Sequence, residues 1–167
     1  MEGNCKFDWS AWKPKEEATL LFLLDTAAGR VLLIHKKRGL GKGKINGPGG
    51  RLEPGETPRE AAVRETREEI GVEVRDAAYC GRLLFHFTDG YDLLGHVFRA
   101  TEWSGEPVET DEAKPEWFSL AAIPYDRMWA DDAQWFPLML AGEPFEGKFV
   151  FDNDTMIESG VEIQPVV

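Results

Sequence analysis

Three glutamates on one predicted helix are the residues best placed to do chemistry. Glu65, Glu68 and Glu69 follow the spacing i, i+3 and i+4, which places them close together on one helical face. Their mutual repulsion has no structural benefit unless cations fill the gap between them. Carboxylate oxygens clustered on a rigid element suit Mg²⁺ or Mn²⁺, which could bridge them to a phosphate chain. The alternative is a solvated acidic face, since Arg64 and Arg67 could neutralise part of the charge.

The helix that carries these glutamates is the clearest element in the sequence. A capping hydroxyl, a proline at the first helical position and a glutamate three residues after the cap mark its start at residues 57–60. The helix is predicted to continue to about Ile70 and to stop at Gly71. Residues 37–55, which precede it, contain seven glycines. This segment must therefore bend tightly and can bring its backbone close to a ligand.

The rest of the chain predicts more strands than helices. Residues 131–140 have a helical pattern, in which Pro137 is expected to cause a break or a late start. Two hairpins are expected, one that joins 18–25 to 31–35 and one that joins 145–151 to 156–163. Further strands are expected at 82–87, 94–101 and 115–118. Strands and helices do not alternate regularly, which favours an α+β fold. We expect a mixed β-sheet flanked by helices, an α/β/α sandwich.

Composition limits the classes of partner. A chain of 167 residues fits one domain, and its net charge of −11 argues against a nucleic-acid-binding surface. A small phosphorylated substrate remains compatible, because divalent cations can invert the local charge of an acidic site. The sequence has neither a membrane-spanning apolar run nor a signal-peptide pattern. With Cys5 and Cys80 as its only cysteines, we expect no disulfide, no membrane partner and a cytoplasmic location.

The glutamates also belong to a longer pattern. Gly50, five residues, Glu56, seven residues and the run RETREEIGV at 64–72 resemble the Nudix box, G-x5-E-x7-R-E-U-x-E-E-x-G-U. Thr66 departs from it where a bulky aliphatic residue is expected. The resemblance implies metal-dependent hydrolysis, by substitution at phosphorus, of a nucleoside diphosphate linked to another group. It implies that the metal ligands are Glu65, Glu68, Glu69 and the Gly50 carbonyl, and that Glu56 and Arg64 brace the motif through a salt bridge.

Outside the box the chain is similar to MutT-type oxidised-purine nucleoside triphosphatases, especially those of animals, over residues 18–158. The segments that carry this likeness are 36–39, 46–50, 85–87, 129–132 and 135–138. It implies a catalytic domain at 18–163, a nucleoside triphosphate as the substrate and a monomer or weak homodimer. Residues 1–17 form an extension with Trp9 and Trp12, which either covers a patch of the sheet or contacts another subunit.

By the same resemblance, the base is bound by Thr19, Asn46, Phe85, Trp129, Asp131 and Asp132. Trp129 can stack on a purine, and Asn46 can donate and accept along its edge. Two adjacent aspartates that face one ligand cannot both ionise cheaply, so one pKa should rise. A protonated partner donates where an ionised one accepts, and exchanging these roles could let one pocket read more than one oxidised purine. The alternatives are a helix cap for the aspartates and core positions for Trp129 and Phe85.

Two further residues have open assignments. Relatives place a glutamate like Glu112 near the metals, where it could bind a cation or help to activate water, although it could equally be a solvated loop charge. Lys36 could contact a phosphate or the catalytic water, or be a plain surface lysine. Ala130 stands where the relatives have a proline, which leaves the conformation of the loop before the aspartates open.

The expected activity is Mg²⁺-dependent conversion of 8-oxo-dGTP or 2-oxo-dATP to the monophosphate and pyrophosphate, which would cleanse the nucleotide pool. The Nudix box reads only phosphate and metal, so ADP-ribose, a dinucleoside polyphosphate or an unmodified dNTP are alternative substrates. A non-catalytic nucleotide sensor would be expected to lose some metal ligands. Isomerisation of isoprenoid diphosphates is disfavoured, because no cysteine lies near the box.

Overall fold

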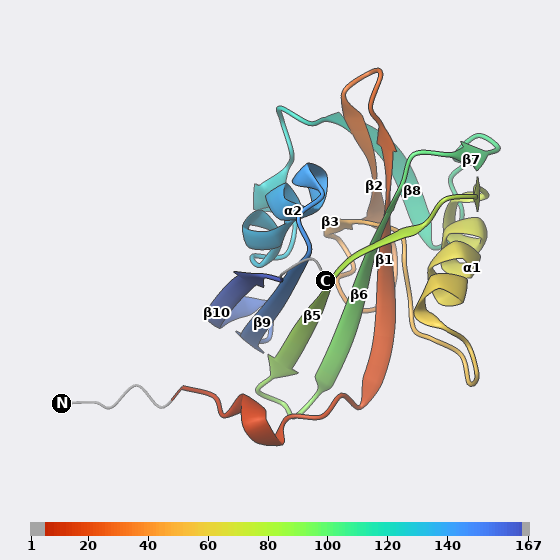
Figure 1. Ribbon diagram of the computed structural model, residues 1–167. Helices are drawn as coiled ribbons and strands as arrows, with labels where there is room; N and C mark the ends of the chain where they lie inside the picture. The colour runs from red at the N-terminus through yellow and green to blue at the C-terminus, as the bar shows by residue number, and fades with distance from the viewer. Residues whose placement is uncertain (1–5, 165–167) are drawn as a thin grey trace.

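A mixed β-sheet forms the centre of the molecule. The structure is a computed structural model that describes residues 6–164 (Figure 1). The eight-stranded sheet has the order β10-β9-β5-β6-β1-β2-β3, and β8 also pairs with β2. Its strands are β1 (Glu16–Asp25), β2 (Arg30–Lys36), β3 (Ile45–Asn46), β5 (Ala78–Phe87), β6 (Asp92–Ala100), β8 (Ala113–Ser119), β9 (Phe145–Asp152) and β10 (Thr155–Ile163). The short strands β4 (Glu73–Val74) and β7 (Trp103–Ser104) pair separately. The mixed sheet and both expected hairpins are confirmed.

A gap between β1 and β2 positions the glycine-rich segment. The two strands pair only beside their turn, at Leu24 with Val31 and Asp25 with Arg30. Further along β1, its amides bond to the loop instead: Leu21 N–H donates to the Pro48 carbonyl (2.9 Å) and Thr19 N–H to the Gly50 carbonyl (2.8 Å). The loop is thus fixed to the central strand by backbone hydrogen bonds.

The two helices cover opposite faces of the sheet. Along β1, Leu21 and Leu23 pack in the cluster that includes Ala62 and Ile70 of α1 (Pro58–Ile70). Phe22 and Leu24 point the other way, into a cluster with residues of α2 (Asp132–Ala141). This alternation follows from the two-residue period of a strand. The expected three-layer arrangement is therefore present, with α1 and α2 on either side of the sheet in Figure 1.

Local signals set both ends of α1. The Thr57 side chain accepts from Glu60 N–H and the Glu60 side chain accepts from Thr57 N–H, each at 3.1 Å, which completes a capping box. Gly71 ends the helix in the left-handed region at φ 73°. Thr66 is fully buried, and its hydroxyl donates to the Ala62 carbonyl at 2.8 Å. The departure from the box therefore leaves no unsatisfied polar group at this position.

The expected interruption at Pro137 is wrong. The structure has one continuous helix, α2, from Asp132 to Ala141, with Pro137 inside it. The carbonyl that loses its usual N–H partner belongs to Ala133, which is exposed, so water can bond to it. Buried Trp135, Phe136 and Met139 hold the helix against the sheet, and this packing outweighs the local penalty.

The remaining elements are short. The described part of the chain contains two 3-10 turns, η1 (Trp9–Ala11) and η2 (Tyr125–Arg127). Cys80 is a buried free thiol whose pKa burial raises to about 11, in keeping with an inert role; Cys5 lies outside the described residues. Within residues 6–164, no helix has the length and apolar character that crossing a bilayer requires.

Candidate active site

A cleft of about 300 Å³ opens where β1 and β2 separate. It receives residues from β1, the glycine-rich segment, α1, β5, β6 and the turn before α2. All seven residues expected to contact substrate line it: Thr19, Lys36, Asn46, Phe85, Trp129, Asp131 and Asp132. Gly50, Glu65, Glu69 and Glu112 line the same cleft. Residues from distant parts of the chain thus meet in one cavity.

Two glycines allow the loop to lie against β1 and α1. A Cβ atom on Gly49 would lie 1.8 Å from the Thr19 carbonyl oxygen, which is a clash with backbone. A Cβ on Gly50 would lie 2.5 Å from the carboxyl carbon of Glu65. Any larger residue would displace the strand or the carboxylate. The glycines of the motif therefore determine how closely the loop approaches Glu65.

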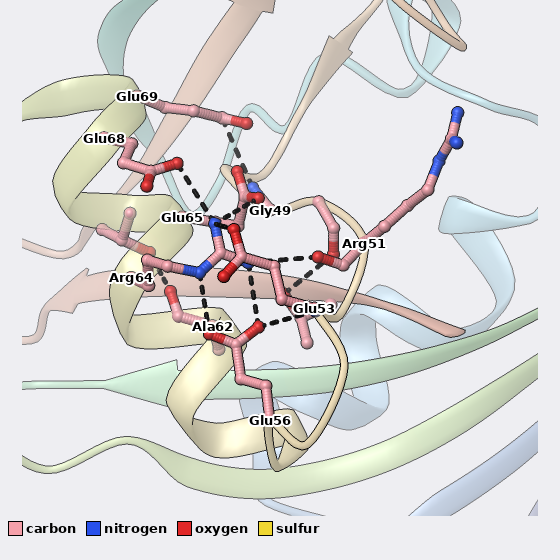
Figure 2. Close-up of polar contacts among 12 residues, drawn as sticks. Gly49, Arg51, Glu53, Glu56, Ala62, Arg64, Glu65, Glu68 and Glu69 are labelled. Carbon is pink, nitrogen blue, oxygen red and sulfur yellow. Dashed lines mark hydrogen bonds and ion pairs between the residues drawn. The ribbon is translucent and has the colours of Figure 1, made fainter. Parts of the chain in front are cut away.

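Arg64 braces the loop against the helix, as Figure 2 shows. Its guanidinium donates two hydrogen bonds to Glu56, at 2.7 and 2.9 Å, and one to the Arg51 carbonyl at 3.1 Å. It also donates to Glu65 at 2.9 Å and to Glu68 at 3.1 Å. The fork of the guanidinium suits such a bidentate pair. The expected Glu56–Arg64 ion pair is therefore present, and it lowers the pKa of Glu56.

Three carboxylates converge on one point of the cleft. One oxygen from each of Glu65, Glu69 and Glu112 lies within 4.8 Å of the others. Burial raises the pKa of Glu69 to about 8, the positive charge of Lys36 opposes this shift, and Glu65 and Glu112 add repulsion. Burial also raises the pKa of Glu65. A divalent cation would relieve this crowding, and the all-oxygen donor set is the type that Mg²⁺ prefers.

Glu68 lies outside this group. Its side chain is half exposed and pairs with Arg64, whereas Glu112, whose place the sequence left open, lies beside Glu65 and Glu69. The Gly50 carbonyl already accepts from the Thr19 backbone N–H at 2.8 Å and from the Thr19 hydroxyl at 3.4 Å, so a metal would have to replace the longer of these two bonds. Metal binding by Glu68 and by Gly50 therefore stays a prediction.

Basic side chains lie beside the carboxylates. The Arg38 guanidinium donates to Glu112 at 2.7 Å, and Lys36 is close enough to Glu69 for its charge to lower the pKa of that residue. Both basic residues line the cleft. The cluster therefore combines carboxylates with positive groups, as a site for a metal and a phosphate requires.

The apolar part of the cleft has an aromatic wall. Trp129 meets Phe87 and Phe151 edge to face, with ring centroids 6.1 and 5.3 Å apart. The Lys44 ammonium lies over Trp129 as well, 5.1 Å from the centre of one ring of its indole. Asn46 accepts the Gly47 N–H through Oδ1 at 2.8 Å, which fixes the plane of its amide. Fixed aromatic and amide planes of this kind can select a flat heterocycle.

Asp131 and Asp132 are a buried, hydrogen-bonded pair at the same wall. Each is 2% exposed. Asp131 accepts from the Trp135 indole N–H at 2.7 Å, and Asp132 accepts from the Trp129 backbone N–H at 3.1 Å. Burial raises the pKa of both; repulsion by Asp131 raises that of Asp132 further, and their side chains hydrogen-bond to each other. The Asp131 side chain makes no capping bond to α2, so the helix-cap alternative does not describe it.

Several cleft residues carried no assignment from the sequence. Phe87 lies two residues after Phe85 on β5, so the period of a strand was the signal that could have found it. Arg38 lies two residues after Lys36, but its pairing with Glu112 depends on a contact between distant segments. Further lining residues without an assigned role include Leu40, Arg51, Leu83, Tyr91 and Leu93.

Comparison with known proteins agrees with this geometry. The NUDIX domain model matches residues 14–139. Oxidized purine nucleoside triphosphate hydrolases from Danio rerio and Mus musculus are 46% and 43% identical to the chain, over 83% and 77% of its length and 90% and 83% of theirs. The crystal structure of a MutT protein from Bacillus halodurans superposes with a TM-score of 0.79 at 27% identity, covering 90% of this chain and 99% of that one. The chain belongs to the Nudix hydrolase family.

Proposed function

We propose that the protein is a Mg²⁺-dependent diphosphatase that hydrolyses oxidised purine nucleoside triphosphates to the monophosphate and pyrophosphate. The observation that carries this proposal is a single cleft holding two different acidic groups. One is the carboxylate cluster of Glu65, Glu69 and Glu112, which suits a metal–phosphate complex. The other is the buried pair Asp131–Asp132, which suits recognition of a base. The names of the zebrafish and mouse relatives support the same substrate class.

The residues around the carboxylate cluster bind and orient the phosphates. Glu65, Glu69 and Glu112 would hold Mg²⁺, with Glu68 and the Gly50 carbonyl as further candidates. The cation would neutralise phosphate oxygens, orient an attacking water and lower its pKa. Water adds to one phosphorus while the bridging P–O bond breaks, which releases pyrophosphate as the leaving group.

Protein groups supply the rest of the positioning. Lys36 and Arg38 place positive charge beside the cluster, where phosphate oxygens carry negative charge during the reaction. Arg64 bonds to Glu56, Glu65 and Arg51 at once, so it fixes a ligand carboxylate relative to the loop. Preorganised ligands lose little freedom when substrate binds, which favours catalysis.

The base is read by groups whose proton positions are set by the protein. Burial raises the pKa of both aspartates, and repulsion by Asp131 raises that of Asp132 further, so the pair shares one proton. Oxidation of a purine changes the pattern of donors and acceptors along its edge. A neutral and an ionised carboxyl can match opposite patterns, and transfer of the proton between them reverses the match. Trp129 offers a stacking surface and Asn46 an oriented amide next to them.

A substrate comparison tests the proposal. We expect kcat/KM for 8-oxo-dGTP and 2-oxo-dATP to exceed that for dGTP by at least about tenfold, because each polar mismatch leaves a buried group unpaired. Pyrophosphate should appear as a product, which cleavage of ADP-ribose cannot yield. Asp131→Asn and Asp132→Asn should change the ratio of the two oxidised substrates, because neither variant can exchange roles. Faster turnover of ADP-ribose or dGTP by the wild-type protein would refute the proposal.

A further inference from the structure

Residues 7–15 begin ahead of the matched NUDIX domain, which starts at residue 14, and lie along the ends of β5 and β6. Figure 1 shows them as the red stretch around η1, beneath those strands. The Phe7 N–H donates to both carboxylate oxygens of Glu158 on β10, at 3.0 Å each. The Phe7 ring stacks on His86 of β5, with centroids 4.1 Å apart and planes 20° apart. We call residues 7–15 the N-terminal strap.

The strap continues to the turn between β5 and β6. The Trp12 indole N–H donates to the Phe85 carbonyl at 3.3 Å. Lys15 follows with two bonds: its ammonium donates to the Gly90 carbonyl at 2.7 Å and its backbone N–H to the Asp92 carbonyl at 2.9 Å. These contacts hold both strands of the hairpin and its turn.

The same hairpin supplies one wall of the cleft. Phe85, Phe87 and Tyr91 line the cavity, whereas His86, between the two phenylalanines, faces the strap. Successive strand residues point to opposite faces, so the strap holds the back of the strand whose front lines the cleft. A hydrogen bond between His86 Nδ1 and Asp92 Oδ1, 2.6 Å long, joins the two strands at this level.

We infer that Trp12 is a positioning residue for substrate, and that the strap sets the affinity for the base by fixing the hairpin that carries Phe85 and Tyr91. This inference rests on the proposed function. The carboxylate cluster is built from α1 and the loop at Glu112, and among the described residues the strap makes its hydrogen bonds and its stacking contact to β5, the β5–β6 turn, β6 and β10 instead. Loss of the strap should therefore weaken base binding and leave the metal-dependent step intact.

The matched pair of variants Trp12→Phe and Trp103→Phe tests this. Both remove an indole N–H, but Trp103 packs near Trp117 in the cluster that also holds α1 residues. For 8-oxo-dGTP we expect Trp12→Phe to raise KM about three- to tenfold, the range for one part-buried hydrogen bond. Its kcat should stay within about twofold of wild type, and Trp103→Phe should leave KM unchanged. A fall in kcat with unchanged KM would overturn the inference.

Amide hydrogen exchange without substrate separates this inference from the proposed function. Trp12→Phe should speed exchange at the β5–β6 turn, residues 86–92, because the strap no longer restrains it. Unchanged exchange there would overturn the inference even if the protein hydrolyses 8-oxo-dGTP. Failure of the wild-type protein to hydrolyse any oxidised purine would refute the proposed function, whereas faster exchange in the variant would still show that the strap restrains the hairpin.

Discussion

Replacing Asp132 with asparagine should stabilise the free protein increasingly as pH rises. The introduced amide would resemble the protonated aspartate in shape and can still donate to Asp131 and accept from the Trp129 N–H. In wild type the raised pKa means that the folded state keeps a proton that the unfolded chain releases above the ordinary aspartate pKa of 3.8. The folded state then binds more protons than the unfolded state, so the free energy of unfolding falls with rising pH.

The size of the effect follows from this linkage. Between 3.8 and the raised pKa, each pH unit lowers the wild-type free energy of unfolding by up to about 1.4 kcal/mol relative to Asp132→Asn. Asp132 is only 2% exposed, so little solvent screening reduces this value. With a urea m-value of about 1.5–3 kcal/mol/M, the unfolding midpoints should diverge by about 0.5–1 M per pH unit.

Urea unfolding from pH 5 to pH 7.5 measures the divergence. Asp126→Asn is the matched control, because Asp126 is exposed on η2. The unfolding midpoint of this variant should follow that of the wild type at every pH. The Asp132→Asn variant should also show altered selectivity between 8-oxo-dGTP and 2-oxo-dATP, since its neutral amide cannot ionise. A gap between Asp132→Asn and wild type that stays constant with pH would refute the argument that Asp132 is protonated in the folded protein.

Three further predictions concern the motif. Glu69→Gln should lower kcat in saturating Mg²⁺ on the order of 100-fold or more with an unchanged circular dichroism spectrum, and a near-normal rate would contradict its metal role. Glu68→Gln should lower kcat less than Glu65→Gln, because Glu68 is half exposed and outside the cluster; an equal loss would place Glu68 among the ligands. Glu56→Gln should cost about 1–3 kcal/mol in urea unfolding, against less than about 1 for the exposed pair in Glu73→Gln. The Glu56 pKa is lowered, so this contribution is complete above pH 4.5 and should be lost progressively as pH falls from 4.5 through the lowered pKa of the folded state. A pH-independent difference would exclude the ion pair as its source.

The sequence predicted α1 in detail because every signal for it is local. Its cap, its first-turn proline and its terminal glycine lie within 15 residues, and the Nudix box fixes Glu56 and Arg64 relative to them. The side chains of Ala61, Ala62, Thr66 and Ile70 on this helix are all fully buried. Local chemistry determined these contacts, so no knowledge of the tertiary structure was needed.

Contacts between distant segments were harder to predict. The helical period alone groups Glu68 with Glu65 and Glu69, yet the third carboxylate of the cluster is Glu112, more than 40 residues along the chain. Its position depends on β8 pairing with β2, where Ala113 lies opposite Lys36. In the same way, burial of Trp135 and Phe136 against the sheet kept α2 continuous through Pro137. Tertiary packing determined these features, and a residue-by-residue reading could not supply it.

The aspartate pair and the glutamate cluster of the cleft each bring carboxylates close together, and each relieves the repulsion between them in a different way. Asp131 and Asp132 are adjacent, fully enclosed and hydrogen-bonded to each other, so one proton shared between them removes most of the cost. Glu65, Glu69 and Glu112 come from separate positions, and one oxygen of each lies within 4.8 Å of the others, so one proton could satisfy only two of the three. Positive charge from Lys36 and Arg38 beside them favours their ionised forms. Spacing and surroundings therefore favour a proton at the aspartates and a cation at the glutamates, which is the division that the proposed recognition of a base and of phosphate requires.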